Sequence, residues 1–121
     1  MTDRELLVLA AKAARYPVRG IAAQMVAYLP DDAPHLVIGN DRGGDSVWNP
    51  LTGDGDAFRL AGRLELDVMH RVVGGKRVEV LAAGGPLIQE FYEGEPYAAV
   101  RRAIVRAAAE VARKRATKET A

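Results

Sequence analysis

Residues 48–61 read WNPLTGDGDAFRLA, a turn-rich segment that passes directly into a helical pattern. Pro50 fixes its own backbone angle and lacks an N–H, and the Asp-Gly steps behind it are favoured in tight turns. The segment also holds the only tryptophan of the chain, Trp48. Because tryptophan is highly buried on average, we expect the Trp48 ring to fix this turn to the core, beside Phe58.

A helix is predicted to follow this turn and to cover about residues 57–64. Asp54 or Asp56 is placed to cap its first turn, since a carboxylate oxygen accepts hydrogen bonds from the free N–H groups there. The helical spacing places Phe58 and Ala61 on the face that we expect to pack on the core.

The chain before this segment predicts a helix and a hairpin. Residues 2–5 have the capping-box pattern of a helix start, and Tyr16-Pro17 ends that helix. Residues 18–29 suit either a helix or a buried strand, and we favour a strand that follows a bend. A turn over 30–34 then leads to a short strand over 35–38.

The chain after the segment predicts a second hairpin and the longest helix. Strand-like residues 66–70 and 78–81 flank Gly74-Gly75, which is a strong hairpin signal. Residues 87–92 are expected to add a strand. Pro96 opens the last helix, because proline suits the first helical position.

The order helix, hairpin, helix, hairpin, helix predicts an α+β fold. We expect a small, mostly antiparallel sheet, built from the hairpins and packed against N-terminal, middle and long C-terminal helices. No repeat or linker divides the chain. Residues 1–116 are therefore predicted as a single domain and residues 117–121 as a disordered polar tail.

The composition excludes several classes of protein. The chain has 121 residues, 49% of them apolar and 27% charged, as expected for one globular domain. The absence of cysteine excludes disulfides and thiolate metal sites. The longest apolar runs are shorter than the ~20 residues of a membrane span, and the polar N-terminus lacks the features of a secretory signal. We expect a cytoplasmic protein with no membrane partner.

Two groups of residues suit catalysis or metal binding at first sight. The carboxylate oxygens of Asp54 and Asp56 would suit a divalent cation, but the calcium-loop pattern needs a ligand where Phe58 stands. Turn formation and helix capping explain both aspartates. His35 and His70 are the only histidines, and no nucleophile pattern accompanies them. The glycine pairs lack the spacing of phosphate-binding loops. We therefore predict no catalytic residue, no metal and no cofactor.

The last helix is rich in basic side chains. Arg102, Arg106 and Arg113 share one face by helical spacing, and such a stripe could follow a nucleic-acid backbone. However, the net charge is only +1, and no aromatic side chains alternate with the arginines for base stacking. A nucleic-acid-associated factor is therefore the alternative function.

A binding module for a protein partner is the favoured function. The candidate interaction loop consists of Trp48, Asn49, Pro50, Leu51, Asp54 and Asp56. An exposed tryptophan there would anchor a partner, whereas a buried one would only hold the loop, and we favour the buried role. The alanine-rich faces of the first and last helices are also suited to pairing in a homodimer.

Two of these segments carry a family resemblance. The motif of residues 48–61, together with residues 96–107, resembles small phage and prophage proteins of unknown function and is distantly similar to the NinX proteins of lambda-like phages. The resemblance implies a phage or prophage accessory protein in the cytoplasm of a bacterial host, with a phage or host protein as its partner. It implies no activity and no catalytic residues.

Overall fold

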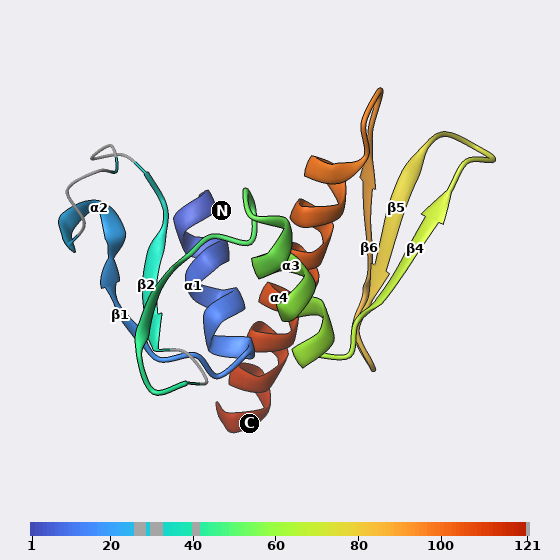
Figure 1. Cartoon of the computed structure of the whole chain (residues 1–121). Helices are drawn as coiled ribbons and strands as arrows, with labels where there is room; N and C mark the ends of the chain where they lie inside the picture. The colour runs from blue at the N-terminus through green and yellow to red at the C-terminus, as the bar shows by residue number, and fades with distance from the viewer. Residues whose placement is uncertain (26–28, 30–32, 40–41, 121) are drawn as a thin grey trace.

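The computed structural model describes residues 1–25, 29, 33–39 and 42–120. Two antiparallel sheets of three strands lie on opposite sides of a central group of helices (Figure 1). The predicted α+β class, with antiparallel strands and helices at the start, middle and end of the chain, is confirmed. The strands form two separate sheets, because helices stand between the two sets of hairpins.

The first sheet has the order β1-β2-β3. Its strands are β1 (Val18–Ile21), β2 (Leu36–Gly39) and β3 (Asp45–Trp48). The central strand β2 is buried along its whole length. Leu36 at its start pairs with Trp48 at the end of β3, so the strand register places the tryptophan against the core.

The strand predicted over 18–29 is correct only at its beginning. β1 ends at Ile21, and α2 (Ala22–Met25) forms a single helical turn. The partner strand β2 begins at Leu36, which pairs with Ile21, so residues 22–25 have no further residue of β2 to pair with. Residues 26–28 lie outside the described part of the chain, as do residues 30–32 of the predicted turn.

The second sheet confirms the predicted hairpin and its third strand. It is built from β4 (Asp67–Arg71), β5 (Arg77–Leu81) and β6 (Leu87–Phe91), in that order. Gly74 and Gly75 both have positive φ angles, 85° and 111°, in the turn between β4 and β5. Glycine reaches this conformation without the steric cost that a side chain would add.

Three longer helices lie between the sheets: α1 (Asp3–Ala13), α3 (Asp54–Arg63) and α4 (Tyr97–Thr120). The predicted capping box at the start of α1 is present. Residues 117–120, which the sequence assigned to a polar tail, belong to α4.

Helices α1 and α4 pack against each other closely, and small side chains make this approach possible. The alanines that both helices contribute to one core cluster are Ala10, Ala11, Ala13, Ala103, Ala107, Ala108, Ala109 and Ala112. The same cluster includes Leu36 of the first sheet and Val80 of the second. The helix pair therefore joins both sheets through a continuous core.

Candidate functional site

The Trp48 ring is buried in the core, as predicted. Only 4% of its surface is exposed. Its neighbour is the Tyr16 ring, which meets it edge-on with 5.9 Å between the ring centres. The predicted contact with Phe58 is wrong, because 78% of Phe58 is exposed to solvent. Trp48 therefore meets Tyr16, which follows α1, and not the Phe58 ring of α3.

Asn49 organises the turn that follows. It is 2% exposed, and its side-chain Oδ1 accepts a hydrogen bond from Leu51 N at 2.9 Å. Its backbone carbonyl accepts a bond from Gly53 N at 2.8 Å, and its backbone N donates to the Asp56 carboxylate at 3.0 Å. The amide of Asn49 also meets His35 Nδ1 at 3.4 Å. This asparagine thus connects the turn to both the start of α3 and the first sheet.

The two aspartates of the turn have structural roles that differ from the prediction. The N-cap of α3 is Gly53, and no side chain caps the helix, so the predicted aspartate cap is wrong. Helix α3 begins three residues earlier than expected, at Asp54. The bond from Gly53 N to the Asn49 carbonyl closes the turn directly before it and orients the backbone for the first helical turn. Asp56 accepts the Asn49 bond instead, and Asp54 forms an ion pair with Arg101 at 2.7 Å.

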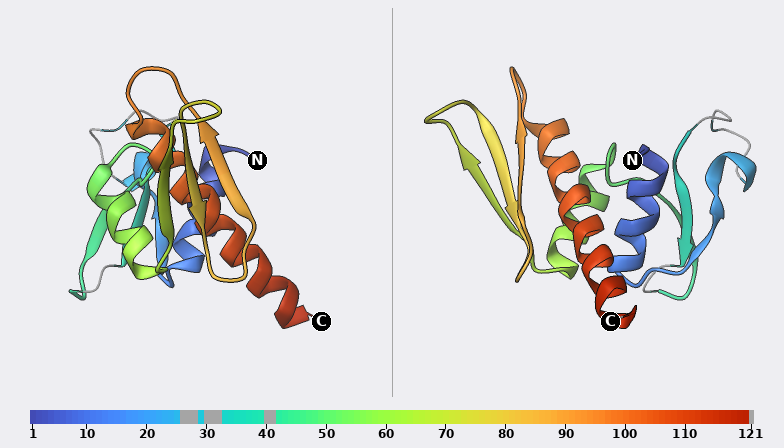
Figure 2. Two further views of the ribbon diagram at one scale, coloured as in Figure 1. Left: turned by 90° about the vertical axis from the view of Figure 1, so that its right-hand side faces the viewer. Right: turned by 180° about the vertical axis from the view of Figure 1, so that it is seen from behind.

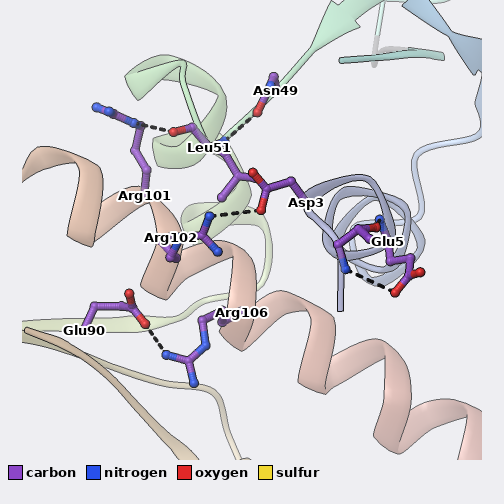
Figure 3. A network of polar contacts seen from close by, with 9 residues as sticks. Asp3, Glu5, Asn49, Leu51, Glu90, Arg101, Arg102 and Arg106 are labelled. Carbon is purple, nitrogen blue, oxygen red and sulfur yellow. Dashed lines mark hydrogen bonds and ion pairs between the residues drawn. The ribbon is translucent and has the colours of Figure 1, made fainter. Parts of the chain in front are cut away.

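The predicted interaction loop is largely inaccessible. Trp48, Asn49 and Pro50 are buried, and Leu51 is half-buried with its carbonyl held by Arg101 at 2.8 Å. Figure 3 shows Arg101 reaching from α4 toward this loop. The loop is a structural connection, and a partner cannot reach its tryptophan in this conformation.

The predicted basic stripe of α4 is neutralised by carboxylates. Its three arginines all form ion pairs, namely Arg102–Asp3, Arg106–Glu90 and Arg113–Glu110. Arg102 joins α4 to the start of α1 at 3.0 Å, and Arg106 joins it to β6 (Figure 3). Two of the three therefore act as contacts between elements, and the stripe does not present free cations to a polyanion.

The two histidines lie far apart in the topology. His35 precedes β2 in the first sheet, whereas His70 is exposed on β4 of the second. The helices α1 and α4 stand between these sheets (Figure 1). The structure does not bring the histidines together.

An apolar groove lies between α3, β4 and α4, with a volume of about 580 Å³. Its floor is formed by Ala57, Ala61, Leu66, Val68, Val100 and Ile104. Two aromatic residues also line it, and both are open to solvent: Phe58 is 78% exposed and Tyr97 is 58% exposed. Asp54 and Arg101, which pair with each other, are among its few charged residues.

The sequence did hold a signal for this groove. Ala57 and Leu60 are the buried residues of α3, and Phe58 lies one position off their stripe. An apolar ring beside the buried stripe of an amphipathic helix is oriented toward the helix flank, where solvent or a partner is found. The prediction placed Phe58 and Ala61 on the core-facing side by helical spacing, whereas the buried positions of α3 are Ala57 and Leu60.

Comparison with protein-family models, curated proteins and solved structures finds no match for this chain. In the described part of the chain, no helix is both long and apolar enough to cross a membrane. The described residues also contain no group of three or more histidine, aspartate or glutamate side chains arranged to hold a metal ion.

Proposed function

We propose that this chain is a non-catalytic module that binds a protein partner in the groove between α3, β4 and α4. The observation that carries the proposal is the exposure of Phe58 and Tyr97 beside an apolar floor. Large aromatic side chains are strongly enriched among the residues that dominate interface energies, and contiguous apolar patches mark interaction sites.

The chemistry of the groove supports binding over catalysis. Of the described residues that line it, none is a serine, threonine or histidine. The charged residues of the described lining are Asp54, Glu65 and Arg101, and Asp54 and Arg101 pair with each other at 2.7 Å. An aliphatic floor with aromatic edges and few charges suits the apolar side chains of a partner, such as one face of an amphipathic helix.

We infer the cellular setting from the resemblance of residues 48–61 and 96–107 to phage and prophage proteins. On that basis the chain is an accessory protein of a phage or prophage in the bacterial cytoplasm. Its partner is then a phage or host protein.

The test compares two double variants, each of which replaces two exposed apolar side chains with serine. Phe58→Ser with Tyr97→Ser removes the aromatic residues of the groove, whereas Val72→Ser with Val73→Ser alters two exposed valines in the β4–β5 turn. Each is used as bait in lysate from phage-infected or prophage-induced bacteria, with nuclease added to remove bridging nucleic acid.

We expect a protein that the wild type and the valine variant retain and the aromatic variant loses. Thermal unfolding of the three baits shows that all are folded before the comparison. Retention of the same proteins by all three baits, or by none, would contradict binding in the groove.

A further inference from the structure

A second hollow, of about 930 Å³, lies between the C-terminal half of α4, the end of α3 and the turn before β6. Its described lining holds five cationic side chains and two acidic ones, a net charge of +3. The charged residues are Arg63, Arg113, Lys114, Arg115, Lys118, Glu65 and Glu110. The whole chain has a net charge of only +1, so positive charge is concentrated here.

Two cations of this basic hollow are held differently from the arginines of the predicted stripe, one of which, Arg113, also lines the hollow and pairs with Glu110. Lys114 donates to the backbone carbonyl of Gly84, and Arg115 donates to the carbonyl of Ala13 at 2.7 Å. Within the described residues, neither of these two nor Lys118 forms an ion pair with a carboxylate. A neutral carbonyl orders the long side chain but leaves its full positive charge, which remains available to an anion.

We propose that this basic hollow binds the phosphate backbone of duplex nucleic acid. Lys114 and Lys118 are one helical turn apart, about 6 Å along the axis, on a helix end that extends beyond the second sheet (Figure 2). Because this helix end projects from the molecule, a rigid nucleic-acid duplex can approach it. Duplex DNA carries one charge per ~1.7 Å of its axis, so closely set cations contact several phosphates at once.

The lining also indicates which part of the nucleic acid is bound. No aromatic side chain is among the described residues of the hollow, so unpaired bases have no ring to stack on. Contacts to phosphates alone hold a duplex without reading its sequence. A polyacidic peptide is the competing occupant and is compared in the test below.

The proposal is tested by fluorescence anisotropy of labelled duplex DNA and duplex RNA between 50 and 200 mM salt. Neutralising about three phosphates gives a slope near −2.7 in log K against log salt, which weakens binding to DNA about 40-fold over this range. Lys114→Glu with Lys118→Glu should lower the affinity at least tenfold. Lys114→Gln with Lys118→Gln removes the charges without reversing them and should give a smaller loss.

The matched control is Arg4→Glu with Lys76→Glu, two exposed cations outside the hollow, which changes the net charge by the same amount. It should keep most of the affinity. The proposal is overturned if neither duplex binds at 50 mM salt, or if the control loses as much affinity as the lysine variant. It is also overturned if a polyglutamate peptide binds more tightly than both duplexes. Because the groove is a different surface, these results do not depend on the protein partner.

Discussion

Two aromatic residues of the central segment show how local geometry decides burial. Trp48 ends β3, and its pairing with Leu36 places its ring on the same face as that buried side chain. Phe58 is equally apolar, but its position in α3 is next to the buried stripe and not on it. Whether a side chain is buried therefore depends more on its position in the repeat of its helix or strand than on its hydrophobicity.

Asn49 shows the same point for a polar side chain. We predict that Asn49→Ala lowers the free energy of unfolding by about 1–3 kcal/mol, because Leu51 N then lacks its acceptor in a part-buried turn. Thr52→Val is the control, since Thr52 is an exposed residue and its hydroxyl donates to the carbonyl of the same asparagine only weakly, at 3.4 Å. Urea unfolding of both variants measures the difference. Equal losses would show that the asparagine has no special role.

At the scale of elements, the predictions succeeded where a local signal was sufficient. The capping box of α1, the glycine pair between β4 and β5 and the proline before α4 each determine their element through neighbouring residues alone. The short helix α2 could not be predicted, because it depends on the length of β2, a strand further along the chain. A local sequence pattern does not determine which distant segment a strand will pair with.

The candidate sites follow the same division. The basic character of α4 was evident from its composition, but which cations remain uncompensated depends on contacts from distant segments. Arg102 meets Asp3, a pairing across almost the whole chain, whereas Lys114 meets a carbonyl. The apolar groove likewise combines α3, β4 and α4, which are separate in the sequence.

The second sheet contains a titratable network on the face of β5 opposite to Val78 and Val80. Glu79 accepts hydrogen bonds from Gln89 of β6 and from Arg71 of β4. The Gln89 bond is the main cause that holds the pKa of Glu79 below its ordinary value, and Arg71 adds to it. Because this carboxylate is favoured in its charged form, it links the stability of the sheet to pH.

We predict that acid removes this contribution. The pKa of Glu79 in the unfolded chain is the ordinary one, about 4.3. The contribution is therefore complete above that pH and is lost as the pH falls through the lower folded value. Glu79→Gln should lose less stability than the wild type between pH 5 and pH 3, measured by urea unfolding. Glu93→Gln, an exposed site, is the control and should behave as the wild type does. Identical acid curves for all three would contradict this role of Glu79.

In the molecule as a whole, α1 and α4 connect two sheets whose strands do not pair with each other (Figure 1). One cluster of buried side chains runs from Leu36 through the alanines of the helix pair to Val80. Small side chains leave little space between closely packed helices. Any enlargement there should disturb both sides of the molecule together.

Ala10→Leu tests this arrangement. Ala10 is fully buried in α1, and adding a larger side chain to a packed core costs about 1–3 kcal/mol. Trp48 fluorescence reports the first sheet, and hydrogen exchange at Val78 and Val80 reports the second. We expect both signals to change at one urea concentration, which the substitution lowers for both by the same amount. Val8→Leu, at an exposed position of α1, should leave that midpoint unchanged. If only the Trp48 transition moved, the second sheet with its groove would be an independent folding unit, since the shared helix pair would no longer couple the two sides.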